Sequence, residues 1–280
     1  MQVADRIAQA GAQLTAAERR VAEVILAKPQ LVAFGTVADL ADAAGAGAAT
    51  VVRLAAKIGY DGFTTLQASV QQDLAQQLRP AAERIRQPAG ADLLAAQLHL
   101  ELGNVQSTLA GVGQTALTDL IDHLADPAAR VYVLSGDASK GVALQFVGDL
   151  VALRDDVALV DGNDIAVRRT IALMRPTDVL VTLDLRRYDR WVIEAAAMAA
   201  SSGAWSVAVV DSVLSPLAST AKRTFTVTAA GAGPFDSHVG TLALLNTIVT
   251  ALAGRLRIVA TSRLDLVEKA WAASHALTDR

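Results

Sequence analysis

Hydrophobic side chains follow two different patterns along the chain. Up to residue 78 they recur every three or four positions in short segments, which is typical of amphipathic helices. After residue 127, five short runs are apolar at nearly every position: residues 130–136, 156–162, 178–184, 205–211 and 223–229. Helical patterns separate most of these runs. Strands that are apolar throughout and alternate with helices indicate a parallel sheet covered on both faces.

The two patterns predict an α/β protein of two domains, an all-α bundle followed by a five-stranded parallel sheet with helices on both faces. We expect the helical domain at residues 1–78, a linker with connecting helices at 79–127, the α/β domain at 128–260 and a C-terminal helix at 261–280. The linker begins with RPAAERIRQP, which has a proline near each end and mixed charge. A length of 280 residues suits two such domains.

Composition narrows the possible functions. The chain has no cysteine, which excludes disulfide scaffolds, thiolate zinc sites and cysteine nucleophiles and fits a cytoplasmic protein. The N-terminus has no basic region followed by an apolar core, so we expect no secretion signal. The longest uncharged run, residues 237–254, is interrupted by histidine, asparagine, glycine and threonine, and we expect a buried helix there and no membrane span. A formal net charge of −3 means that any contact with nucleic acid must come from a local basic patch.

Short helical segments in the first domain have the spacing of a helix-turn-helix. Thr15 and Glu18 have the Thr-x-x-Glu spacing of a capping box, and a similar cap recurs at Thr36. The helix after Thr36 ends at a glycine turn, and residues 48–58 then form a helix with basic residues on its outer face. If that helix recognises DNA, the contacting residues are Thr36, Ala48, Thr50, Arg53 and Lys57. The alternative is a helical domain with a solvated face, which the count of six Lys or Arg against seven Asp or Glu in residues 1–78 favours.

The stretch LTAAERRVAEVILAKPQLVAFGTVADLADAAGAGAATVVRLAAKIGYDGFTTLQ resembles the N-terminal domain of the RpiR family of bacterial transcriptional regulators. The family's Thr-Val-x-Arg run is present at residues 50–53, and its Lys-x-Gly-aromatic-x-Gly-aromatic ending is present at residues 57–63. One position differs, because Gly47 stands where the family usually has a serine and offers no hydroxyl to a phosphate. The resemblance implies that a double-stranded DNA operator is the partner of the helical domain.

Polar residues follow three of the predicted strands at their carboxyl ends, where open parallel sheets bind ligands. The first strand is followed by SGDASKG, whose small residues let backbone N–H groups and a helix N-terminus approach an anion. The fourth is followed by DSVLSPLA, in which Ser215-Pro216 is expected to start a helix. Ser237 and His238 open the last long helix; they either face the crevice or serve only as a cap and a partly buried histidine. The candidate ligand-binding residues are Ser135, Gly136, Ser139, Asp184, Arg186, Arg187, Asp211, Ser237 and His238.

The run GAWSVAVVDSVLSPLASTAKRTFTV resembles the SIS (sugar isomerase) domain, which follows the helix-turn-helix in RpiR regulators. The resemblance implies that the second domain binds a phosphosugar, that Ser139 contacts the phosphate and that the domain self-associates. The usual Ser-x-Ser-Gly-x-Thr run after the third strand is replaced here by Asp184-Leu185-Arg186-Arg187-Tyr188-Asp189. Arg186 or Arg187 can hold a carboxylate or phosphate in a two-pronged bond, with Asp184 orienting the fork. The alternative is an ion pair, within the chain or across a dimer, with Asp184, Asp189 or Asp211.

Isomerisation of a phosphosugar needs a base at the crevice, usually a glutamate. The sequence places no glutamate on a crevice loop, because Glu194 lies within a predicted helix, and it has no metal-ligand cluster and no nucleophile–base spacing. We therefore expect a cytoplasmic regulator without enzymatic activity, metal or cofactor, which acts as a homodimer or homotetramer. It would bind operator DNA and a small anionic metabolite, a phosphosugar or a related carboxylate or phosphate. The alternatives are an SIS-type phosphosugar isomerase and a dimerisation module that binds no ligand.

Overall fold

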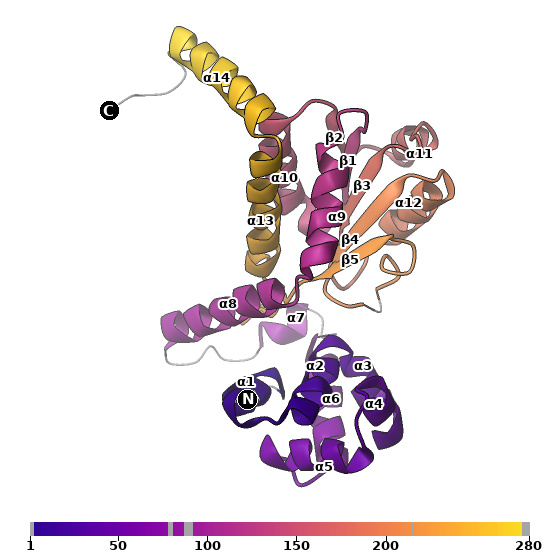
Figure 1. Ribbon diagram of the computed structural model, residues 1–280, viewed down its shortest axis with the longest axis vertical. Coiled ribbons are helices and arrows are strands. Elements are labelled where there is room, and N and C mark those ends of the chain that lie inside the picture. The colour runs from indigo at the N-terminus through magenta and orange to yellow at the C-terminus, as the bar shows by residue number, and fades with distance from the viewer. Residues whose placement is uncertain (1–2, 78–80, 87–91, 214, 276–280) are drawn as a thin grey trace. The chain divides into compact units, whose positions relative to one another are not determined.

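The computed structural model of the protein describes residues 3–77, 81–86, 92–213 and 215–275. The chain divides into two compact units, Met1–Gln87 and Pro88–Arg280. They are drawn in Figure 1, and each is described by itself. The domain boundaries expected at residues 78, 127 and 260 stay predictions.

The first unit is helical throughout its regular structure. Its helices are α1 (Val3–Ala10), α2 (Ala16–Ala27), α3 (Pro29–Phe34), α4 (Val37–Ala43), α5 (Ala48–Lys57), α6 (Phe63–Gln77) and α7 (Ala81–Arg84), with a 3₁₀ turn at Gly11–Gln13. Both predicted capping boxes are present, Thr15 with Glu18 before α2 and Thr36 with Asp39 before α4. The apolar faces of these helices share one core whose fully buried members include Leu40, Leu54 and Leu66.

The second unit is built on a parallel sheet of five strands. Two helices precede it, α8 (Leu93–Ala110) and α9 (Gln114–Ala125), in the region where connecting helices were predicted. The strands are β1 (Val131–Ser135), β2 (Val157–Val160), β3 (Val179–Leu183), β4 (Trp205–Val210) and β5 (Arg223–Thr226), in the order β2-β1-β3-β4-β5. All four pairings are parallel. The predicted fold class is confirmed.

Helices cover both faces of the sheet, as the wholly apolar strands require. Residues of α9, α10 (Lys140–Leu153) and α13 (Val239–Arg255) pack on one face, and residues of α11 (Asp164–Ala172) and α12 (Arg190–Ser201) pack on the other (Figure 1). Helix α13 is the uncharged run that we expected to be buried, and it buries Leu244, Leu245, Ile248 and Leu252. The last helix is α14 (Arg257–Ser274), which begins earlier than the predicted C-terminal helix.

Two sequence-based expectations need comment. The prediction that a helix starts at Ser215-Pro216 is wrong, because residues 216–220 form turns. The Ser215 hydroxyl accepts a hydrogen bond from the Leu217 backbone N–H in this turn. Within the described part of the chain, no single helix is both long and apolar enough to cross a membrane. Helices α13 and α14 pass that test only as a pair bent by 103°.

Candidate functional site

Two regions carry the predicted functional residues, the α4–α5 pair of the first unit and the carboxyl edge of the sheet in the second. Helices α4 and α5 are joined by a short turn in which Gly45 has φ +55°, a conformation that favours glycine. Arg20 of α2 fixes this turn, since its Nε donates to the Ala44 carbonyl oxygen at 3.2 Å and its Nη2 to that of Gly45 at 3.1 Å. Gly47 is the N-cap of α5 in extended conformation, without a side-chain cap. This arrangement is that of a helix-turn-helix with α5 as the recognition helix.

Arg53 and Thr50 of α5 form a pair. The Arg53 side chain is exposed, and its Nη2 donates to the Thr50 Oγ1 at 3.0 Å. Thr50 itself is only 8% exposed, because it lies on the face that packs on the core. Of these two predicted DNA contacts, Arg53 is on the surface, and Thr50 supports it from beneath.

Lys57 has a partner inside the unit. Its Nζ lies 2.7 Å from Oε2 of Glu18 on α2 and also donates to the Gln13 carbonyl oxygen at 3.1 Å. Glu18 is 4% exposed, and the hydrogen bond from Lys57, followed by that from the Thr15 backbone, lowers the pKa of its carboxyl group to about 2. Lys57 therefore links α5 to α2 within the unit, and its contact with DNA stays a prediction. The Thr36 hydroxyl is likewise used in its cap, where it donates to Asp39 Oδ2 at 2.7 Å.

At the carboxyl edge of the sheet, Asp184 directly follows β3 and is 2% exposed. A Cβ atom on Gly136, which follows the neighbouring strand β1, would lie 2.2 Å from Asp184 Oδ1, so only glycine fits beside this carboxyl group. Asp184 Oδ2 accepts a hydrogen bond from the Asp189 backbone N–H at 2.7 Å. Burial, with the nearby charges of Asp189 and Asp211, raises the pKa of Asp184 to about 7.

The arginine that follows β3 is paired within the chain. Arg186 Nη2 lies 2.6 Å from Asp211 Oδ2, and the two side chains are 16% and 11% exposed. The Tyr188 hydroxyl donates to Asp211 Oδ1 at 2.6 Å, and burial together with this bond raises the pKa of Tyr188. The ion pair that the sequence left open is thus present, and its partner is Asp211. Asp184 Oδ2 is bonded to the Asp189 N–H, so an orienting role for Asp184 stays a prediction, and Arg187 is exposed on the same loop.

Ser139 lies in the turn between β1 and α10, and His238 is bonded to the backbone of the preceding residue of that turn. Ser139 is 1% exposed and is the N-cap residue of α10, and among the described residues its Oγ has no hydrogen-bond partner. His238 precedes α13 and hydrogen-bonds the Ala138 backbone, while its Nδ1 is buried and also lacks a partner in the described structure. Burial lowers the pKa of His238, which keeps the imidazole neutral. Ser237 instead donates to Glu101 Oε2 at 2.7 Å and accepts from the Val239 N–H, so it ties α13 to α8.

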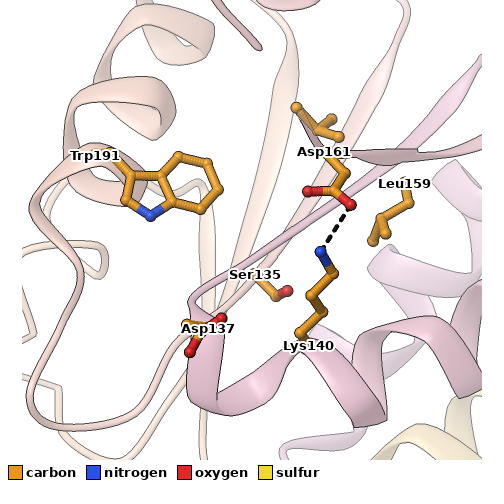
Figure 2. Close-up of a pocket in the computed structure, with 7 residues that line it drawn as sticks. Ser135, Asp137, Lys140, Leu159, Asp161 and Trp191 are labelled. Carbon is orange, nitrogen blue, oxygen red and sulfur yellow. Dashed lines mark hydrogen bonds and ion pairs between the residues drawn. The ribbon is translucent and has the colours of Figure 1, made fainter. Parts of the chain in front are cut away.

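A pocket of about 100 Å³ opens beside β1 and β2 (Figure 2). Lys140 Nζ lies 2.8 Å from Asp161 Oδ2, and the indole of Trp191 faces this ion pair across the pocket (Figure 2). The pocket is lined by Ser135, Asp137, Lys140, Leu159, Val160, Asp161 and Trp191. Ser135 was among the residues predicted from the sequence, and the other six were not. Asp161 could have been found, because it directly follows a strand as Asp184 and Asp211 do.

Two segments of the chain match known families. Residues 1–77 match the family described as a helix-turn-helix domain of the rpiR family, and residues 123–251 match the SIS domain. The chain therefore has a helix-turn-helix domain of the rpiR family followed by an SIS domain. It is 28% identical to the HTH-type transcriptional regulator HexR of Pseudomonas aeruginosa over 210 residues, which cover 74% of this chain and 72% of HexR. It is also 25% identical to an HTH-type transcriptional regulator of Haemophilus influenzae, over 77% and 76% of the two chains.

Solved structures show the same fold. The sugar isomerase domain of an RpiR transcription factor from Sphaerobacter thermophilus is 27% identical, with a TM-score of 0.58 over 63% of this chain and 98% of that one. The Vibrio vulnificus NanR protein, solved with ManNAc-6P, is 19% identical, with a TM-score of 0.59 over 99% of both chains. An Escherichia coli CFT073 protein solved with a phosphosugar is 16% identical, with a TM-score of 0.52 over 63% of this chain and 95% of that one. The last two likenesses concern the fold alone.

Proposed function

We propose that this regulator binds operator DNA as a cytoplasmic homodimer or homotetramer and that its SIS unit binds a small anionic metabolite which alters that binding. The observation that carries the proposal is the buried Ser139 hydroxyl, which has no partner among the described residues and stands at the N-terminus of α10. A buried hydroxyl without a partner costs free energy, and a ligand oxygen would remove that cost.

The position of Ser139 suits an anion. The first N–H groups of a helix have no partner within it and carry a partial positive charge, so a phosphate or carboxylate is favoured there. In a neutral imidazole whose other ring nitrogen donates to the Ala138 backbone, Nδ1 of His238 is an acceptor, so it can accept a hydrogen bond from a hydroxyl group of a ligand and not bond the anionic group itself. NanR and the CFT073 protein, which share this fold, were solved with ManNAc-6P and with a phosphosugar, which supports a sugar phosphate as the ligand class.

The loop after β3, which carries Arg186 and Arg187, limits how an anionic ligand can bind. Arg186 already forms an ion pair with Asp211. An anionic ligand that binds this guanidinium group must therefore either displace the Asp211 carboxylate or bind beside it. Arg187 is exposed and needs no such displacement. We expect the other crevice residues, among them Ser135, Gly136 and Asp184, to shape the site without contacting the charged group of the ligand.

Regulation requires a difference in ligand affinity between two arrangements of the protein. The test is fluorescence anisotropy of the full chain on labelled DNA from upstream of its own gene, with and without sugar phosphates and small carboxylates. One compound should change the DNA affinity, and Ser139→Ala should weaken its effect by about 10- to 100-fold in concentration, the value of a charge-assisted hydrogen bond. Ser219→Ala, at an exposed turn, is the matched control. Operator binding that no compound alters would contradict the sensor role.

The isomerase alternative has one observation in its favour, the pKa of about 7 at Asp184, which is suitable for a general base. However, this carboxyl group is 2% exposed and covered by Gly136, and its Oδ2 is occupied by the Asp189 N–H. A base must reach the proton that it removes. We therefore propose binding without turnover, and detectable isomerisation of a compound that binds would overturn this part of the proposal.

A further inference from the structure

The outward face of α5 carries methyl groups and the guanidinium group of Arg53; Lys57 is also exposed on α5 but is paired with Glu18. Ala49, Val52, Arg53 and Ala56 are all exposed, with Val52 at 45%. Their spacing of i, i+3, i+4 and i+7 places them in one stripe along the helix. Thr50, Val51, Leu54 and Ala55 occupy the opposite, buried face. This stripe is the surface that a recognition helix presents to the major groove.

The polar groups that normally distinguish bases are missing from this stripe. Adenine is recognised by Asn or Gln, cytosine by Glu or Asp, guanine by Arg or Lys, and thymine by apolar contact with its methyl group. The α5 sequence AATVVRLAAK contains no amide and no carboxylate. Its hydroxyl, on Thr50, is buried and bonded to Arg53, and its lysine is paired with Glu18 at 2.7 Å. Only thymine and guanine contacts remain available to α5.

We infer that α5 recognises its operator through thymine methyl groups, contacted by Ala49, Val52 and Ala56, together with one guanine per subunit bound by Arg53. The hydrogen bond from Arg53 to Thr50 at 3.0 Å holds the guanidinium group over the stripe and reduces the ordering needed on binding. The N-cap Gly47 adds no side chain to this surface. The inference rests on the proposed DNA-binding function and extends it to the base composition of each half-site.

The experiment uses the full chain and an operator selected by the protein from a random DNA pool. Each thymine of one half-site is replaced in turn by deoxyuridine, which lacks only the 5-methyl group, and the Kd is measured by anisotropy. At the base pairs under α5, loss of the methyl group should weaken binding about three- to fivefold, the value of one buried methyl contact. Thymines elsewhere in the site should tolerate the replacement.

Variants assign the contacts to residues. Val52→Ala should abolish the difference between thymine and deoxyuridine at one position while leaving the affinity for the deoxyuridine operator unchanged. Arg53→Ala should remove the preference for guanine at another position. Leu26→Ala, at a residue of α2 that is 50% exposed, is the matched control and should preserve the full thymine dependence. Because Val52 is on the surface, its truncation should not unfold the domain.

The outcomes separate this inference from the function on which it rests. Binding to a selected operator that is insensitive to every deoxyuridine replacement would overturn thymine recognition and leave the DNA-binding function standing. Equal weakening of both operators by Val52→Ala would also overturn it. Failure to select any sequence from the pool would overturn the DNA-binding function and the inference together.

Discussion

The ion pair between Lys57 and Glu18 makes a strong prediction about the helix-turn-helix. Glu18 is 4% exposed, and its pKa is lowered from 4.5 to about 2, first by Lys57. A depression of this size corresponds to about 3 kcal/mol of stability, since each pKa unit is worth about 1.4 kcal/mol. This contribution is present above pH ~4.5 and is lost as the pH falls toward ~2, because the unfolded carboxyl group binds a proton first.

The perturbation is Lys57→Met, which keeps an unbranched apolar side chain one atom shorter and removes the ammonium group. It leaves a buried carboxylate held only by Thr15, and we expect a loss of about 1.5–3 kcal/mol. All three tryptophans of the protein lie in the second unit, so hydrogen–deuterium exchange is the suitable assay for the first. Amides of α2 and α5 should exchange about 10- to 150-fold faster at pH 7 in the variant.

The control is an ion pair of similar geometry on the surface. Arg255 and Asp122 lie 3.0 Å apart, and their side chains are 60% and 52% exposed. Exposed pairs contribute about 0–1 kcal/mol, so Arg255→Met should accelerate local exchange less than about fivefold. If Lys57→Met accelerates exchange no more than this control does, the reasoning from burial is refuted.

DNA binding supplies an independent readout for the same variant. A lysine that contacts a phosphate contributes about 0.9 to the slope of log affinity against log salt concentration, whereas an internal lysine contributes nothing to it. Lys57→Met should therefore lower DNA affinity without changing that slope. A slope reduced by about 0.9 would restore Lys57 as a phosphate contact.

Three further predictions concern the second unit, and each is measured by urea unfolding followed through tryptophan fluorescence. Because the pKa of Asp184 is raised from 3.8 to about 7, the folded state retains a proton that the unfolded chain releases. The free energy of unfolding of the wild type should therefore fall between pH ~4 and ~7 and then level off. An Asp184→Asn variant that showed the same fall would contradict the assignment to Asp184. Gly136→Ala should lower the free energy of unfolding by about 1–3 kcal/mol, because its Cβ atom would lie 2.2 Å from Asp184 Oδ1. The control is Gly148→Ala in α10, where the space around the Cβ position is open, and it should be neutral or stabilising. Equal effects of the two substitutions would argue against close packing at Gly136. Tyr188→Phe should cost about 1–3 kcal/mol by removing one hydrogen bond to the buried Asp211 carboxylate, and an unchanged midpoint would show that the hydroxyl adds nothing there.

Local chemistry is what made much of the fold predictable. The capping boxes at Thr15 and Thr36 depend on residues three positions apart, and both are present. The apolar strands and the long apolar stretch of α13 depend on patterns within a single segment, and the parallel sheet follows from the alternation of strands with helices. The predicted helix at Ser215-Pro216 failed because a serine–proline start is also compatible with a turn.

The sequence by itself determined the two-domain organisation, the helix-turn-helix and the set of polar residues at the ends of the strands. Only the tertiary structure decided how these residues are paired: Arg186 with Asp211, 25 positions away, and Lys57 with Glu18, 39 positions away. For Arg186, the predicted topology brought Asp184, Asp189 and Asp211 all close enough to pair; for Lys57, the sequence pattern indicated no partner. The choice among them depends on distances of a few ångströms between separate elements, and hydrophobic periodicity carries no information about those distances.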